Sequence, residues 1–275
     1  MAKLTKIVVS AFLFFQTIIY SSETEAPIEF CFVICSYNNV SCCEENLESV
    51  FCQTYPHWSI YYTDDCSTDG TGEKVDAYVK RKGMSERCHV VHNSVRQGAM
   101  KNSYRAIYSC SPRTVIVILD GDDTLSDPSV LETLARVYSD PSVWITYGSD
   151  RHLSSGKRAP RCHAFPQEVM KNRTFRKYRW IANLPRTFYA GLFHKIHKKD
   201  LMYEGEFVPI CCDVAYMFPM FEMASQGHIR YIEKILYVYN DSNPLNDIRT
   251  RRELNRKMSK YLASKKPYPP LKKLF

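Results

Sequence analysis

Three aspartates within four residues directly follow the most apolar run of the chain. Asp120, Asp122 and Asp123 come after residues 114–119, which have the composition of a buried strand. Carboxylates held this close repel one another, and a divalent cation that carries phosphates would remove the repulsion. Hard oxygen ligands of this kind suit Mg²⁺ or Mn²⁺. The alternative is a strand end followed by an acidic turn and a helix cap, and this segment alone does not decide between the two.

Two further polar clusters follow apolar runs in the same way, namely Ser36-Tyr37 and Asp64-Asp65. Between residues 29 and 148 such runs alternate with segments of helical periodicity, which predicts an α/β fold with a mostly parallel sheet. In sheets of this type ligands bind outside the carboxyl ends of the strands. We therefore expect the three clusters to converge on one site.

The elements that must position this site can be predicted from the same patterns. We expect strands at 30–35, 58–62, 88–91, 114–119 and 143–147, with a helix opened by Asp127 as its cap and Pro128 at its first position. The second half is less regular. There we expect loop or cover over 151–179, a helix from Asp213 to about 226, and a closing pair of strands at 228–232 and 235–239.

Composition limits the kinds of ligand. The chain has 275 residues and a net charge of +8, so a ligand rich in phosphate is plausible. Nucleic acid is not indicated, because the basic residues are spread along the chain and no motif that reads DNA or RNA is present. The exception is a basic helix and tail at 247–275, which we expect to be a solvated or membrane-surface segment.

The N-terminal segment has the pattern of a targeting sequence. Lys3 and Lys6 precede the apolar run 7–20, so residues 1–22 predict a signal peptide or a signal-anchor. Either one directs the chain to a secretory or export pathway, in a lumenal or extracytoplasmic location or anchored to a membrane. The eleven cysteines form no compact framework and leave disulfide pairing open.

Taken in order, the motifs resemble those of family 2 glycosyltransferases of the GT-A type. The segments that carry the resemblance are VICSYN (33–38), QTYPHW (53–58), DDCSTDGT (64–71), RQG (96–98) with Asn102, LDGDD (119–123) and ILYVY (235–239). The resemblance implies one GT-A domain over about 28–246, with a Rossmann-like nucleotide-binding half and an acceptor half. It also implies a nucleotide-sugar donor such as a UDP-sugar, a Mg²⁺ or Mn²⁺ ion, and inversion at the anomeric carbon.

The resemblance also implies roles for the residues that would hold the donor nucleoside. Ser36 and Tyr37 would contact the base and ribose, and Asp65 would accept a hydrogen bond from the base. Gly98 would let the backbone pass close to the ribose, while Arg96 would offset phosphate charge. Two alternatives remain open: the Asp64-Asp65 pair could serve as a turn or a helix cap, and Arg96 could be a plain surface charge.

The remaining roles concern the metal and the chemistry. Asp120 would bind ribose hydroxyls, Asp122 would be the main metal ligand, and Asp123 would either join it or cap the next segment. Asp213 occupies the place of the base that takes the proton from the acceptor hydroxyl. Cys212 replaces the acid that usually precedes this base, so a helix N-cap remains the alternative role for Asp213.

Three classes of function remain. The leading hypothesis is an inverting, metal-dependent glycosyltransferase that acts on a hydroxyl of a glycan, lipid or protein. A nucleotidyltransferase would normally show a Gly-rich, basic loop after the first strand, and residues 35–39 lack it. A binding module that has kept the fold and lost catalysis is the third class, to which Cys212 points.

Overall fold

A computed structural model describes residues 26–244 and 250–275. The predicted leader at 1–22 lies outside the described residues, as does the predicted boundary at 246–247. Within the described part of the chain, no helix has both the length and the apolar character needed to cross a membrane.

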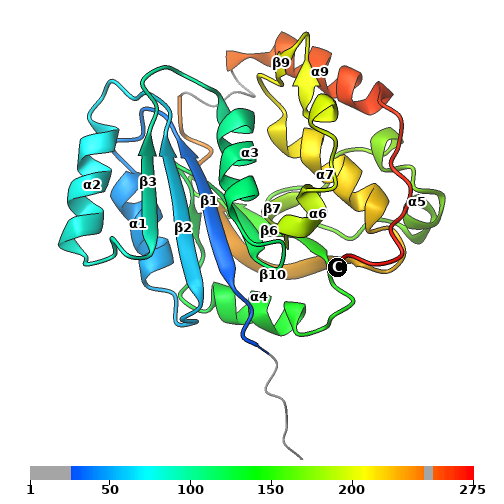
Figure 1. Ribbon diagram of the computed structural model, residues 1–275, viewed down its shortest axis with the longest axis horizontal. Helices are drawn as coiled ribbons and strands as arrows, with labels where there is room; N and C mark the ends of the chain where they lie inside the picture. The colour runs from blue at the N-terminus through cyan, green and yellow to red at the C-terminus, as the bar shows by residue number, and fades with distance from the viewer. Residues whose placement is uncertain (1–25, 245–249) are drawn as a thin grey trace, which may run out of the picture.

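One eight-stranded sheet forms the centre of the molecule (Figure 1). Its strand order is β3-β2-β1-β4-β7-β6-β10-β5, and β8 pairs with β9 in a separate small ribbon. The strands are β1 (Phe30–Ser36), β2 (Trp58–Asp64), β3 (Cys88–His92), β4 (Val115–Asp120), β5 (Thr124–Leu125), β6 (Ile145–His152), β7 (Asn183–Tyr189), β8 (Met202–Tyr203), β9 (Glu206–Phe207) and β10 (Ile229–Tyr239).

The strands β1, β2, β3 and β4 are parallel. β1 and β4 are buried along nearly their whole length, as strands covered on both faces must be, whereas β3 at the edge of the sheet is partly exposed. In the parallel register Cys35 lies beside Asp120 and Ser36 beside Asp64. The polar clusters that follow these strands therefore meet at one edge, as predicted. The arrowheads of β1 and β2 in Figure 1 point to this edge.

Helices cover both faces of the sheet. On one face α1 (Cys43–Phe51), α2 (Thr71–Arg81) and α4 (Val130–Tyr138) share a core with Phe32, Val117 and their neighbours. On the other face the core contains residues of α3 (Ala99–Ser109), α6 (Ala190–Phe193), α7 (Cys212–Met223) and α9 (Arg252–Ser264). The shorter helices are α5 (Gln167–Asn172), η1 (Phe175–Lys177) and η2 (Lys198–Leu201).

The C-terminal helix is integrated into this second core. Met258 and Leu262 of α9 are fully or almost fully buried. The Arg176 guanidinium donates to the buried Glu222 carboxylate at 2.6 Å and to the carbonyl of Leu262 at 2.6 Å. Glu222 also accepts the backbone amide of Tyr268 at 2.9 Å. The segment we expected to be solvated thus has one exposed face and one buried face.

Several predicted elements differ from the structure. The helix α4 begins at Val130, because the Asp127 carboxylate instead caps a turn by accepting from the Ser129 amide. Residues 229–239 form one irregular strand parallel to β6, not two. The strand predicted at 143–147 starts at Ile145, and 151–179 contains α5 and η1. For β6 and β10 it is pairing between distant strands, not the local pattern, that sets the boundaries.

The strand β7 was not predicted. It lies antiparallel between β4 and β6, and Pro185 and Arg186 interrupt its apolar pattern. Pro185 follows a cis peptide bond. A strand with a proline and a charge at its centre does not resemble a buried strand in sequence.

Candidate active site

The predicted donor residues begin at the ends of β1 and β2. The amide of Asp65 donates to the carbonyl of Ser36 at 2.8 Å, which fixes the two loops against each other. Gly121 packs against the same point, since a Cβ there would lie 2.7 Å from the Cβ of Ser36. The loop after β4 can approach the loop after β1 only because residue 121 has no side chain.

The carboxylate of Asp65 is buried and organises the loop before α3. It accepts from the backbone amides of Gln97 at 2.8 Å and Gly98 at 2.9 Å, and from the side chain of Asn93 at 2.9 Å. Burial alone would raise the pKa of Asp65, but hydrogen bonds from Asn102, these amides and Asn93 together lower it below its usual value. Asp65 is therefore charged at neutral pH.

Gly98 has a φ of +83° and open space where its Cβ would lie. Its requirement for glycine is thus conformational. Arg96 lies over the ring of Tyr37 with 3.6 Å between its guanidinium carbon and the ring centroid, and its Nε is 3.7 Å from Asp65. Ser36 differs from these two residues, since its hydroxyl is buried and accepts from Asn39 at 3.0 Å. Tyr37 and Arg96 form the accessible part of the predicted nucleoside site.

The aspartate loop after β4 is held by two residues to which the sequence analysis assigned no role in the site. The side-chain amide of Asn46 donates to the carbonyls of Asp120 at 2.8 Å and Asp123 at 2.7 Å. The hydroxyl of Tyr237 accepts from the amide of Asp120 at 3.0 Å and donates to the carboxylate of Asp123 at 2.8 Å. The ILYVY segment of β10 thus serves the site by fixing this loop.

The three aspartates of the loop have different surroundings. Asp123 is buried, and its second carboxylate oxygen accepts from the amide of Asn240 at 2.6 Å. Its role as a metal ligand remains a prediction, but its carboxylate already has a structural function. Asp120 is exposed, and Asp122 is half-buried and accepts from the side chain of Asn243. Asp120 and Asp122 are the carboxylates best placed to reach a ligand.

Burial makes the charged forms of Asp122 and Asp123 unfavourable. It raises the pKa of Asp122, and it raises the pKa of Asp123 still further with the help of the charges of Asp120 and Asp122. Within 26–244 and 250–275, no three or more His, Cys, Asp or Glu side chains are grouped so as to hold a metal ion by themselves. One or two carboxylates that share a cation with a diphosphate and water would fit this donor set.

Arg186 of β7 connects the aspartate loop to the acceptor half. Its guanidinium donates to the carboxylate of Asp213 at 2.9 Å and to the carbonyl of Ala182 at 2.8 Å. Burial would lower the pKa of Arg186, but the charge of Asp213 and then those of Tyr216, Asp120 and Tyr237 keep it raised. Arg186 is thus a largely buried cation that pairs with Asp213 and is also affected by the charge of Asp120.

Asp213 lies in the first turn of α7, whose N-cap is Cys211 in a left-handed conformation. It is therefore not the cap itself, but it lies where a helix dipole favours a negative charge. Its side chain is 26% exposed, so an incoming hydroxyl can reach it.

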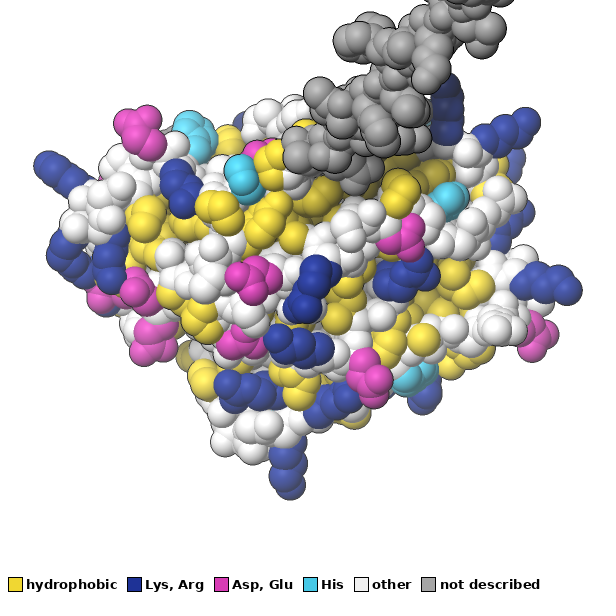
Figure 2. All heavy atoms as spheres, turned by 90° about the horizontal axis from the view of Figure 1, so that it is seen from below, with side chains coloured by type: hydrophobic (Ala, Val, Ile, Leu, Met, Phe, Trp, Pro, Cys, Tyr) yellow, Lys and Arg dark blue, Asp and Glu magenta, His cyan; other side chains and the backbone are white. Residues whose placement is uncertain are grey.

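These contacts bring the predicted site residues to one region. The charges of Asp120 and Asp65 both act on Cys35, and the charges of Asp213 and Asp120 both act on Arg186. Arg186 was missed because β7 was missed. The signal that could have found it is a lone arginine between apolar residues, which needs a buried counter-charge. The opposite end of the molecule, seen in Figure 2, shows lysines and arginines dispersed among acidic side chains.

The fold matches solved structures of glycosyltransferases, which confirms the predicted GT-A fold. TarS of S. aureus (residues 1–349) aligns with a TM-score of 0.59 at 18% identity, over 78% of this chain and 60% of that one. The mannosyltransferase PcManGT from Pyrobaculum calidifontis, in complex with GDP-Man and Mn²⁺, aligns with a TM-score of 0.59 at 19% identity, over 89% and 68% of the two chains. TarS has also been solved in complex with UDP-GlcNAc.

The chain belongs to glycosyl transferase family 2, whose family model matches residues 31–201. It is 39% identical over 88 residues to the putative teichuronic acid biosynthesis glycosyltransferase TuaG of Bacillus subtilis, a match that covers 32% of this chain and 33% of that protein. It is 31% identical over 128 residues to the hyaluronan synthase of Streptococcus pyogenes, covering 46% and 30%. The matches span about a third of the length of these relatives.

Proposed function

We propose that the protein is an inverting glycosyltransferase that moves a sugar from a nucleotide-sugar, a UDP-sugar in the first place, to a hydroxyl of a glycan, lipid or protein. The observation that carries the proposal is the ion pair at 2.9 Å between the largely buried Arg186 and the Asp213 carboxylate, together with the charge of Asp120, which also acts on Arg186. The candidate base thus pairs with a cation that also responds to the charge of the donor-binding loop. Family membership and the UDP-GlcNAc complex of TarS support the choice of donor.

In this mechanism different residues bind the donor, take the proton and position the base. Tyr37, Arg96 and Asp65 bind the nucleoside, and Asp120 binds ribose hydroxyls. The Asp213 carboxylate takes the proton of the acceptor hydroxyl as its oxygen forms a bond to the anomeric carbon. The bond from that carbon to the diphosphate oxygen breaks on the opposite side, and UDP leaves with the electron pair. Arg186 holds the base in position through the 2.9 Å contact.

Asp122, with Asp120 or Asp123, would hold a Mg²⁺ or Mn²⁺ ion. When bound, this ion would stabilise the negative charge that develops on the departing diphosphate. The raised pKa values of Asp122 and Asp123 support such a role, because a bound cation would stabilise the charged form of these carboxylates. The Mn²⁺ in the PcManGT complex supports it further.

Release of UDP from a panel of UDP-sugars, measured with and without Mn²⁺, tests the proposal. We expect turnover that depends on the ion and on an acceptor alcohol. Asp213→Asn should lower kcat by about 10²–10⁴-fold and leave the Kd of UDP unchanged, because the loss concerns proton transfer alone. Asp140→Asn, which changes an exposed carboxylate that pairs with Arg230, is the matched control. Wild-type turnover by Asp213→Asn would exclude this residue as the base.

A second candidate is a nucleotide-sugar or glycan-binding module without catalysis. The ion pair between Arg186 and Asp213 favours it, since an arginine at 2.9 Å already occupies the carboxylate that would have to accept the proton. Cys212 in place of the usual acid points the same way. Binding of UDP without release from any UDP-sugar, across all acceptors, would decide for this module. A nucleotidyltransferase is a third and weaker candidate, which pyrophosphate release would reveal.

The location of the protein is a separate part of the proposal. The basic and apolar pattern of residues 1–22 supports entry into a secretory or export pathway, with membrane association through the N-terminus if the segment is retained. N-terminal sequencing of the protein recovered from cells tests it. A start at Met1 in a soluble fraction would refute both forms.

A further inference from the structure

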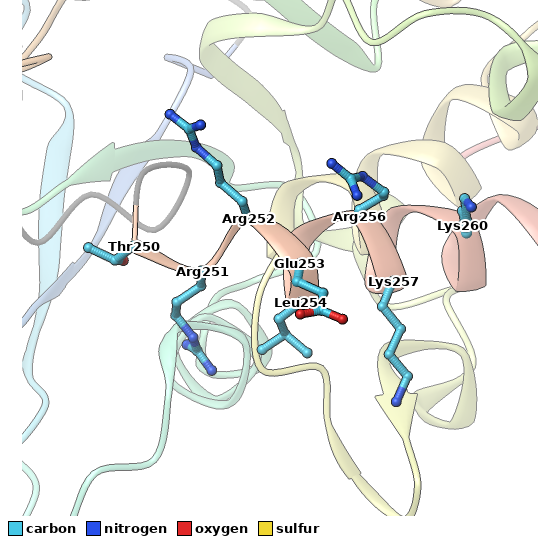
Figure 3. A pocket seen from close by; sticks show the side chains of 8 residues that line it. All are labelled: Thr250, Arg251, Arg252, Glu253, Leu254, Arg256, Lys257 and Lys260. Carbon is cyan, nitrogen blue, oxygen red and sulfur yellow. The ribbon is translucent and has the colours of Figure 1, made fainter.

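Three cations lie in a row along α9. Arg252, Arg256 and Lys260 are spaced four residues apart and therefore share one face of the helix. Figure 3 shows the side chains of Arg252 and Arg256 extending to the same side, away from those of Arg251 and Lys257. At 1.5 Å per residue the row is about 12 Å long.

The row is not neutralised within the described part of the chain. No ion pair or hydrogen bond there involves the side chains of Arg252, Arg256 or Lys260, and all three residues are exposed. Like charges four residues apart destabilise a helix by roughly 0.2–0.5 kcal/mol for each pair. An arrangement that costs stability and gains no internal partner suits an external anion.

The row also borders a hollow of about 700 Å³. Five of the eight residues that line it are basic and one, Glu253, is acidic. The concentration of positive charge here differs from the face in Figure 2, where both signs are mixed. A surface on which one sign of charge predominates attracts ions of the other sign.

The hollow lies next to the segment that leads into the candidate base. The guanidinium of Arg251 donates to the carbonyl of Pro209 at 3.3 Å. The thiol of Cys211 contacts the carbonyl of Asn255 at 3.7 Å and the hydroxyl of Ser259 at 3.6 Å. Since Asp213 follows two residues after Cys211, α9 borders the acceptor side of the site. The residues that bind the nucleoside, Tyr37 and Arg96, come from the loops after β1 and β3.

We propose that the row of Arg252, Arg256 and Lys260 binds an acceptor that carries repeated anionic groups, carboxylate or phosphate, and guides its terminal hydroxyl to Asp213. This inference rests on the glycosyl transfer proposed above and adds the chemical class of the acceptor. Repeated charges at spacings of about 6 Å would match one turn of the helix. The arginines suit either anion, because the guanidinium binds carboxylate and phosphate in the same bidentate manner.

The test compares two triple variants with the same change in charge. Arg252→Gln/Arg256→Gln/Lys260→Gln removes the row, and Lys266→Gln/Lys272→Gln/Lys273→Gln removes three exposed lysines from the tail. Gln keeps the helix propensity close to that of Arg and Lys. The Kd values of a galacturonate hexamer, a polyphosphate chain of about ten units and neutral maltohexaose are measured for both variants and for the wild type. The Kd of UDP is measured alongside.

We expect the first variant to bind one of the two anionic probes at least about tenfold more weakly, and the tail variant to change less than about twofold. The preferred probe identifies the anion as carboxylate or phosphate. Maltohexaose should bind weakly throughout, and the Kd of UDP should not change. Should the first variant not fold by far-UV circular dichroism, Arg256→Glu alone replaces it, with Lys272→Glu as its control.

Equal losses in both variants would overturn the inference, since they would mean nonspecific attraction. A weaker affinity for UDP in the first variant would assign the row to the donor diphosphate instead. Binding to vesicles with 30% phosphatidylglycerol, without binding to either soluble anion, would assign it to a membrane surface. Failure of the glycosyl transfer itself is separate, because it appears as no UDP release by the wild type while anion binding persists.

Discussion

Replacing Arg186 by Gln tests the central contact of the site. The change removes the cation from the 2.9 Å pair with Asp213 and leaves the side chain able to hydrogen-bond. Exposed pairs contribute about 0.2–1 kcal/mol, and breaking a fully buried pair costs about 3–5 kcal/mol. Arg186 is 12% exposed and Asp213 26%, so this pair falls between the two limits. We expect Arg186→Gln to lower the free energy of unfolding by about 2 kcal/mol.

A loss of this size should lower the melting temperature by about 4–8 °C for a chain of this length. The turnover number should fall by about 10–100-fold, less than in a variant that lacks the base, because Asp213 remains but is no longer held. Arg186→Lys should recover part of the stability through its charge. It should recover little turnover, since lysine cannot donate to Asp213 and to the carbonyl of Ala182 with the same planar group.

The assay is thermal unfolding followed by circular dichroism, together with UDP release under saturating donor. Arg230→Gln is the matched control, because it breaks an exposed pair with Asp140 at 3.0 Å and should cost no more than about 1 kcal/mol. If Arg186→Gln melts and turns over like Arg230→Gln, Arg186 neither stabilises the site nor positions the base, and the mechanism above is wrong.

Three further substitutions test other parts of the site and the fold. Gly121→Ala should weaken ion-dependent UDP release at least tenfold, because its Cβ would lie 2.7 Å from that of Ser36 and displace the aspartate loop; wild-type kinetics would refute this. Asp65→Asn should lower the free energy of unfolding by about 2 kcal/mol at neutral pH. Since the folded-state pKa of Asp65 is lowered, this difference should be present above the usual carboxyl value of 3.8 and disappear as the pH falls through the lower folded-state value; a difference that grows in acid would contradict it. Glu222→Ala should lower the melting temperature by about 10 °C or more, because the buried Arg176 would lose its counter-charge; Glu206→Ala, an exposed change, should have little effect.

The sequence allowed much of the donor half to be predicted. The runs that form β1 and β4 are continuously apolar, and such a local pattern suffices for strands that are covered on both faces. Shorter apolar patterns also predicted β2 and β3. Their parallel order places the polar clusters around Asp65 and Asp120 at one edge. The grouping of these residues therefore followed from the alternation of strands and helices before any contact was known.

The acceptor half could not be predicted to the same extent, because its elements depend on partners distant in the chain. Arg186 lies in a strand that exists only through its pairing with β4 and β6, and its charge is tolerated only because Asp213 lies across from it. The same holds for Asp123, whose burial depends on the hydroxyl of Tyr237, more than a hundred residues away. Residue types and their local order thus determined the family, the donor-side cluster and the requirement for glycine near 98. Which carboxylate is buried, which is paired and which remains accessible was decided only by tertiary packing, since solvation and counter-charge are properties of the folded surroundings.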